Sequence, residues 1–153
     1  TLPTYIYVCI GIKQAANNAN QFFIEQSVTA NSNPGFYFNG ADGQVWDFNR
    51  SSAQHGGVGT SATWAGASAA VAEMSYNGVG SYSRNGVVQS NGSIFGISRA
   101  NSNVTDAIYI YSRDGGGLFT NGNLYGLVIA PYSSIGFRPR IRTWMGRKVG
   151  LSL

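Results

Sequence analysis

Short segments in which apolar residues alternate with other residues recur along this chain, and turn sequences separate them. In the first such segment, residues 6–12, Ile and Val alternate with Tyr7, Cys9 and Gly11. Successive side chains of a β-strand point to opposite faces, so a period of two places the aliphatic residues together. The pattern predicts a strand with one aliphatic core face.

Similar patterns predict about nine strands in total, and the others span residues 21–28, 35–39, 44–48, 70–76, 81–84, 94–98, 107–112 and 124–130. Asn77-Gly78 and Asn85-Gly86 favour type I′ hairpin turns, because both residues tolerate a positive φ. The chain also has 21 Gly, 17 Ser and 14 Asn among its 153 residues, and these are turn formers and poor helix formers. We therefore expect an all-β fold, with residues 54–70 as a loop that holds at most one edge strand.

The periodicity changes only near the end of the chain. Phe137, Ile141, Trp144 and Met145 have the spacing of one helical face, and Gly150 is suited to end a helix. The sequence predicts that this face packs on the body, with the arginines on the opposite side and the apolar tail tucked in. The expected domains are a β-sandwich over residues 1–133 and a basic amphipathic helix with its tail over 134–153.

The net charge of +4 belongs to that C-terminal segment. Five of the ten Lys and Arg residues are Arg138, Arg140, Arg142, Arg147 and Lys148, whereas residues 1–137 hold five cations against six acids. A basic tail on a nearly neutral body is weak evidence for nucleic-acid binding, so no nucleic-acid partner is expected. No apolar run is long enough for a membrane span, and no signal peptide is visible, so no membrane partner is expected.

Three segments, residues 74–88, 108–113 and 118–129, together resemble the laminin G-like jelly rolls of the concanavalin A-like lectin/glucanase superfamily. The best match is Phe119-Thr-Asn-Gly122 through Leu127. The ending, residues 141–153, is similar to the last helix of a subgroup found in phage and prophage structural proteins. The resemblance covers residues 70–153 well and the first half only by pattern. It implies a concanavalin A-like jelly-roll β-sandwich with one C-terminal α-helix, located in a virion.

The resemblance also implies a function. The leading hypothesis is a non-catalytic phage structural module, in a tail fibre or appendage, with a lectin-like surface for host surface polysaccharide. The alternative is a capsid or tail decoration or assembly domain that contacts other virion proteins or copies of itself and has no sugar ligand. Domains of this family usually begin with an extra strand near the final one. In this chain the extra strand has been lost, lies upstream in a longer polypeptide or is donated by another chain. An uncovered strand edge tends to pair with another strand, so we favour a partner of some kind.

The pattern of acidic residues argues against catalysis. No two of the six acids lie within four residues of each other, whereas glucanases of the resembling superfamily carry paired acids at alternate positions of one strand. The sequence has no Gly-x-Ser-x-Gly motif that would place a nucleophilic serine for His55 to activate. Because Cys9 is the single cysteine, the chain can form neither an internal disulfide nor a structural zinc site. We expect no enzymatic activity, and a degenerate glycosidase with acids from distant strands is the weaker alternative.

Sugar binding needs flat aromatic faces and polar groups that bond to hydroxyls. The candidates in this sequence are Trp46, Trp64, Tyr109, Tyr111, Asp114 and Asn121. Tyr109 and Tyr111 alternate with Ile108 and Ile110, so a tyrosine-lined sheet face is the best single candidate, and Tyr37 is among the further aromatic residues available.

Two other kinds of site are weighed. Arg138, Arg140 and Arg142 are candidates for contact with an acidic partner, although cations near a helix C-terminus also simply favour the helix dipole. Calcium could be bound by oxygens of Asp106, Asp114, Asn121 and Asn123. Hard cations want several carboxylates, however, so no metal or other cofactor is expected.

Overall fold

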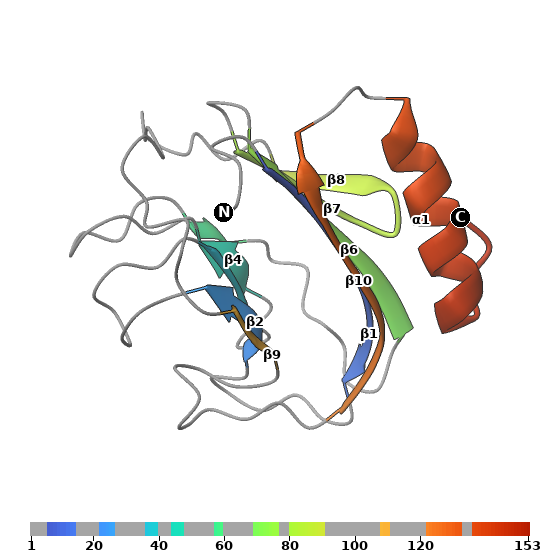
Figure 1. The fold of residues 1–153 in the computed structure, drawn as a ribbon, viewed down its shortest axis with the longest axis horizontal. Coiled ribbons are helices and arrows are strands. Elements are labelled where there is room, and N and C mark those ends of the chain that lie inside the picture. Colours follow the sequence, from blue (N-terminus) through green and yellow to red (C-terminus); the bar gives the residue numbers. More distant parts are fainter. Residues whose placement is uncertain are drawn as a thin grey trace.

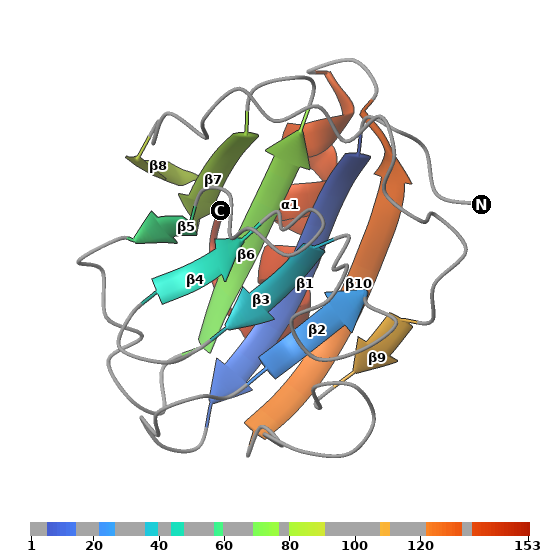
Figure 2. The same cartoon turned by 90° about the vertical axis from the view of Figure 1, so that its left-hand side faces the viewer.

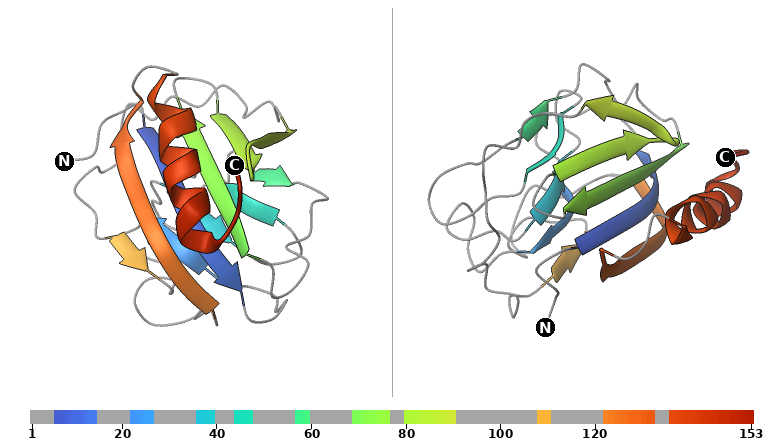
Figure 3. Two further views of the ribbon diagram at one scale, coloured as in Figure 1. Left: turned by 90° about the vertical axis from the view of Figure 1, so that its right-hand side faces the viewer. Right: turned by 90° about the horizontal axis from the view of Figure 1, so that it is seen from above.

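Antiparallel strands in two five-stranded sheets, followed by one helix, make up the described structure (Figures 1 and 2). The computed structural model describes residues 6–14, 22–26, 36–39, 44–47, 57–59, 69–76, 80–90, 108–110, 122–132 and 136–153. Sheet A has the order β10-β1-β6-β7-β8, and sheet B has the order β5-β4-β3-β2-β9. The two sheets lie opposite each other, and the helix covers the outer face of sheet A (Figures 1 and 3).

The strands of sheet A are β1 (Ile6–Gln14), β6 (Ala69–Tyr76), β7 (Gly80–Arg84), β8 (Val87–Ser90) and β10 (Gly122–Pro131). Those of sheet B are β2 (Phe22–Gln26), β3 (Phe36–Asn39), β4 (Gln44–Asp47), β5 (Gly57–Gly59) and β9 (Ile108–Ile110). The helix is α1 (Phe137–Val149). The prediction of a mostly β chain with one C-terminal helix is confirmed.

Individual elements agree with the sequence patterns to different degrees. Asn85 and Gly86 have φ values of 51° and 82°, so the predicted hairpin turn between β7 and β8 is confirmed. β5 is the predicted edge strand within residues 54–70, whereas β8 was not predicted. The strand predicted at 94–98 and the turn at Asn77-Gly78 lie outside the described residues. No helix in the described part is long and apolar enough to span a membrane.

Strand β1 lies between β10 and β6 and is buried on both faces. Val8, Ile10 and Ile12 are fully buried, as the predicted core face requires. On the other face, Tyr7 and Cys9 are also buried, because they pack with Val71, Met145 and Val149 beneath the helix. The prediction of one core face was therefore incomplete, since the helix closes the second.

The helix approaches sheet A most closely over two paired glycines, Gly11 of β1 and Gly126 of β10. A Cβ atom at Gly11 would lie 2.7 Å from Sδ of Met145, and one at Gly126 would lie 2.9 Å from the same sulfur. Neither distance leaves room for a methyl group. The missing side chains thus let Met145 rest directly on the backbone of the sheet, where it is fully buried.

The face of the helix that packs on the sheet differs from the predicted one. Met145 is buried and Ile141 partly buried, but Phe137 and Trp144 are 56% and 48% exposed. In their place, Arg138 and Arg142 turn toward the sheet. The prediction was wrong for these four side chains. The spacing of apolar residues along the chain gives no information about a charged residue on the sheet with which a helix arginine pairs.

The end of the helix agrees with the prediction. Gly150 adopts a left-handed conformation with φ 79°, and the backbone N–H of Leu151 donates a 2.8 Å hydrogen bond to the carbonyl of Gly146. This arrangement satisfies carbonyls at the helix end. Leu151 and Leu153 then pack against the cluster under the helix, as expected for the apolar tail.

We expect Gly11→Ala to lower the free energy of unfolding by about 1–3 kcal/mol, because the new methyl group overpacks the contact with Met145. Chemical denaturation monitored by circular dichroism measures this. Gly136→Ala is the matched control, since a Cβ atom there meets nothing within 4 Å. Equal stabilities of the two variants would contradict the close approach.

Cys9 provides a test of burial under the helix. Burial, with a smaller contribution from Glu73, raises the pKa of the Cys9 thiol from 9.0 to about 12. We expect the folded protein to resist thiol-labelling reagents at pH 8 and the unfolded chain to react fully. Because the folded pKa is the higher one, the stability due to neutral Cys9 is complete below pH 9 and is lost between pH 9 and about 12. Cys9→Ala should show a smaller loss over that range, and rapid labelling of native protein would refute the assignment.

Candidate functional site

A row of tyrosines and acids crosses sheet B. Glu25 of β2 is the register partner of Tyr109 on β9 and of Tyr37 on β3, and Tyr37 in turn is the partner of Asp47 on β4. Directly paired residues of neighbouring strands share one face of a sheet. These four positions, called here the tyrosine–acid row, therefore lie side by side on one face of sheet B.

A second row, one residue along, lies on the opposite face. It runs from Ile110 through Ile24 and Phe38 to Trp46, and Ile24 is fully buried. Ile110, at the edge of the sheet on β9, is 47% exposed, and Tyr109 beside it is half-buried.

The predicted sugar-binding residues are thus divided. By strand register, Tyr109 lies in the tyrosine–acid row, whereas Trp46 lies in the other row with Ile24, which is fully buried. Trp64, Tyr111, Asp114 and Asn121 lie outside the described residues. Glu25 and Asp47 were not predicted as site residues, because they join Tyr109 only through strand pairing. From the sequence, these two acids could have been identified only by aligning the predicted strands in their correct register.

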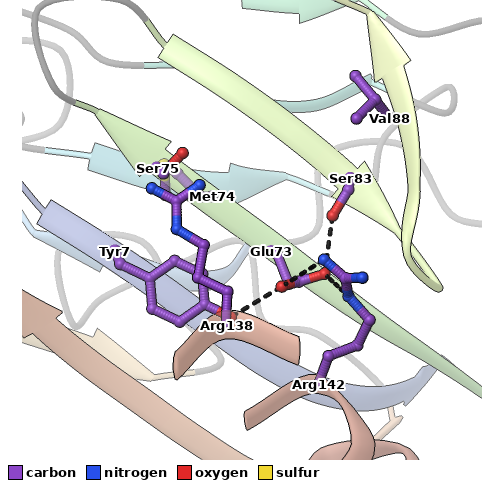
Figure 4. A pocket seen from close by; sticks show the side chains of 8 residues that line it. All are labelled: Tyr7, Glu73, Met74, Ser75, Ser83, Val88, Arg138 and Arg142. Carbon is purple, nitrogen blue, oxygen red and sulfur yellow. Dashed lines mark hydrogen bonds and ion pairs between the residues drawn. The ribbon is translucent and has the colours of Figure 1, made fainter. Parts of the chain in front are cut away.

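On the other side of the molecule, Glu73 of β6 forms a buried hydrogen-bonded cluster beneath the helix (Figure 4). Its Oε1 accepts a 2.8 Å bond from the hydroxyl of Tyr7, and its Oε2 accepts one of 2.8 Å from Ser83. Arg142 of α1 completes the cluster, donating from Nε to Oε2 at 2.5 Å and from Nη2 to Oε1 at 3.2 Å. The carboxylate is therefore held by donors from three different elements.

The electrostatics of this cluster raise the pKa values of Tyr7 and Arg142. Burial, to which Cys9 and Glu73 add, holds the pKa of Tyr7 well above its usual value, so the phenol keeps its proton. The hydrogen bond to Glu73 raises the pKa of Arg142. The carboxylate of Glu73 accepts four hydrogen bonds from Tyr7, Ser83 and Arg142, and these bonds stabilise the docked helix. With four hydrogen bonds already accepted, this carboxylate is poorly placed to act on a substrate.

The three arginines proposed for partner contact have different environments. Arg142 is bound to Glu73, and Arg138 stacks over the rings of Tyr132 at 4.3 Å and Tyr7 at 5.4 Å. Both side chains are half-buried, and only Arg140 of the three is exposed. The predicted outward arginine surface is therefore reduced to Arg140 on this part of the helix.

The exposed side of the helix combines aromatic and basic residues. This aromatic–basic face consists of Phe137, Arg140, Trp144, Arg147 and Lys148. Nζ of Lys148 lies 4.7 Å from the centre of the Trp144 ring, a cation–π contact. Arg147 and Lys148 also lie in the last turn, where cations favour the helix dipole.

No cluster of three or more His, Cys, Asp or Glu side chains suited to a metal occurs in the part of the chain that the structure describes. Of the residues considered for calcium, only Asn123 is described, and it is exposed on β10. The question of calcium therefore rests on residues outside the described ranges.

No family model matches this chain, and no curated protein matches it in sequence. Solved structures with a similar fold include sialidases. A mutant of Trypanosoma rangeli sialidase with trans-sialidase activity matches with a TM-score of 0.59 and 11% identity, over 97% of this chain and 24% of that one. Trypanosoma rangeli sialidase itself gives a TM-score of 0.56 and 10% identity over the same shares of the two chains. The chain thus spans about a quarter of the sialidases whose fold it matches.

These likenesses concern the fold alone, since the identities are so low. They add no support for the resemblance to phage concanavalin A-like domains, which stays a prediction.

We expect Glu73→Gln to lower the free energy of unfolding by about 2–3 kcal/mol, because the partly buried Arg142 loses its charged partner. Urea denaturation measures the change. Arg140→Gln, which removes an exposed charge from the same helix, should change stability by less than about 0.5 kcal/mol. A similar small effect for both variants would mean that the cluster does not hold the helix.

Proposed function

We propose that this protein is a non-catalytic glycan-binding module with a jelly-roll β-sandwich fold, and that it belongs to a phage virion, in a tail fibre or other appendage. Three observations support this proposal. The described strands form two opposed antiparallel sheets with a C-terminal helix, and solved sialidases contain a part with a similar fold. The sequence resembles laminin G-like jelly rolls over residues 70–153, and its ending, residues 141–153, resembles the last helix of phage structural proteins.

The tyrosine–acid row is the observation that carries glycan binding. A tyrosine ring can stack on the apolar face of a pyranose, and a carboxylate accepts hydrogen bonds from two sugar hydroxyls. Tyr109, Glu25, Tyr37 and Asp47 alternate the two chemistries across four adjacent strands. Two carboxylates in one row also repel an anionic sugar, so the ligand of this surface is a neutral polysaccharide.

Binding explains the site better than hydrolysis does, although the structural neighbours are sialidases. The positions of Glu25 and Asp47 are separated by two strand spacings, about 10 Å. The two carboxyl groups stand about 5–5.5 Å apart in a retaining glycosidase and about 6.5–9.5 Å apart in an inverting one, so the spacing argues against the retaining geometry and exceeds the inverting one only slightly. Glycosidases of the sialidase type use a tyrosine nucleophile. Tyr7 beside Glu73 is unsuited to that role, because it is 3% exposed and keeps its proton.

The alternative function is a decoration or assembly domain without a sugar ligand. One observation favours it: Phe137 and Trp144 expose about half of their side-chain surface on the aromatic–basic face. Aromatic residues with Arg are typical of protein–protein contacts. In this alternative the partner is another virion protein or a second copy of the chain.

We expect the protein to bind neutral polysaccharides or oligosaccharides on a glycan array, and Tyr109→Ala to weaken this binding about tenfold, as loss of a stacking residue does. Tyr125→Ala is the matched control, because Tyr125 is 36% exposed on β10 of the other sheet. Glu25→Gln should weaken binding as well. Isothermal titration calorimetry gives the affinities.

Several outcomes would overturn the proposal. Absence of binding at about 10 mM sugar, or equal losses for Tyr109→Ala and Tyr125→Ala, would exclude the row as a glycan site. Release of reducing sugar that Glu25→Gln abolishes would show catalysis instead. Self-association or capture of virion proteins that Trp144→Ala removes, without any sugar binding, would support the assembly function.

A further inference from the structure

A cavity of about 90 Å³ lies between the first turns of α1 and the outer face of sheet A (Figure 4). The charged residues that line it within the described part of the chain are Glu73, Arg138 and Arg142. Glu73 and Arg142 form a closed pair. The positive charge of Arg138 is therefore not balanced by another lining residue, and the described side chains that line the cavity have a net charge of +1.

Arg138 is not satisfied by its neighbours. Its guanidinium stacks on Tyr132 and Tyr7, but Nε and Nη2 are buried and have no hydrogen-bond partner in the part of the chain that the structure describes. Buried donors that carry charge are costly to leave without an acceptor. The stacked rings hold the guanidinium in place, and a group bound in the cavity would supply the acceptor that the described residues do not.

The geometry of these two atoms indicates which acceptor fits. Nε and Nη2 form the side-on fork of an arginine, which matches the two oxygens of a carboxylate. Arg142 uses the same two atoms to hold both oxygens of Glu73. Arg138 lies one helical turn before Arg142. It presents the same pair of donor atoms that Arg142 uses to bind a carboxylate, and in Arg138 these atoms have no partner among the described residues. Its place in the first turn adds the positive end of the helix dipole.

The size of the cavity sets a limit on the ligand. About 90 Å³ is several times the volume that a single water needs in a cavity, which is enough for a carboxylate group. Val88, on the edge of the cavity, is 56% exposed, so the cavity opens beside the hairpin of β7 and β8. A carboxylate can enter there while the rest of its molecule stays outside.

We propose that this cavity is a binding site for a carboxylate group, held by the Nε–Nη2 fork of Arg138. The site lies on sheet A, whereas the tyrosine–acid row belongs to sheet B, and it does not depend on the proposed glycan function. Its ligand is either a free small carboxylate or the carboxylate of an acidic sugar.

The test uses the whole chain and matched probes: sodium acetate, sodium glucuronate, glucose, and sodium chloride at equal ionic strength. Binding is followed by calorimetry and by the rise in melting temperature that a ligand of the native state produces. We expect both carboxylates to bind and glucose and chloride not to. Glucuronate alone would identify an acidic sugar, and equal binding of acetate would identify a simple carboxylate.

Arg138→Gln should weaken carboxylate binding by at least about tenfold, and Arg140→Gln, an equal loss of charge on the exposed side, should leave it unchanged. Arg138→Lys, which keeps the charge but has no fork, should also bind more weakly, and it serves if Arg138→Gln does not fold. The proposal is overturned if neither carboxylate binds better than chloride, if the Arg138 and Arg140 variants behave alike, or if Arg138→Lys binds as well as the wild type.

Discussion

A buried carboxylate sets the position of the helix on this protein. Glu73 projects from the middle of sheet A on the face away from the core, where it is 4% exposed. It needs several donors to remain there, and Tyr7, Ser83 and Arg142 supply them from β1, β7 and α1. The helix must therefore present Arg142 to the sheet, and its rotation about its own axis follows from that single pairing.

The rotation decides what the surface of the molecule offers. With Arg142 and Met145 turned inward, Phe137 and Trp144 are left exposed. Arg138 lies one turn before Arg142 on the same side and is brought against Tyr7 and Tyr132 with part of its fork empty. Gly11 and Gly126 make the same docking possible from the side of the sheet, because any side chain there would push Met145 away.

The two sheets thus differ in chemistry. The strand register of sheet B pairs tyrosines with acids, which is the basis of the proposed glycan site, whereas the helix side of sheet A carries an excess of positive charge around a small cavity. The fold also occurs as about a quarter of much larger sialidases. A module of this size can contribute binding to a larger assembly without any chemistry of its own, and that is the role proposed for it.

The sequence by itself determined the strands of β1, β6 and β10, the hairpin at Asn85-Gly86 and the helix with its Gly150 end. These depend on local periodicity and on φ preferences of single residues, which act over a few positions. Tertiary structure decided which face of the helix is buried and which residues share a site. Glu73 meets Tyr7 and Arg142 across separations of 66 and 69 residues, and Tyr109 meets Glu25 only through strand register. Such contacts depend on strand order and on the charge balance of the packed interior, and no local pattern in the chain encodes either.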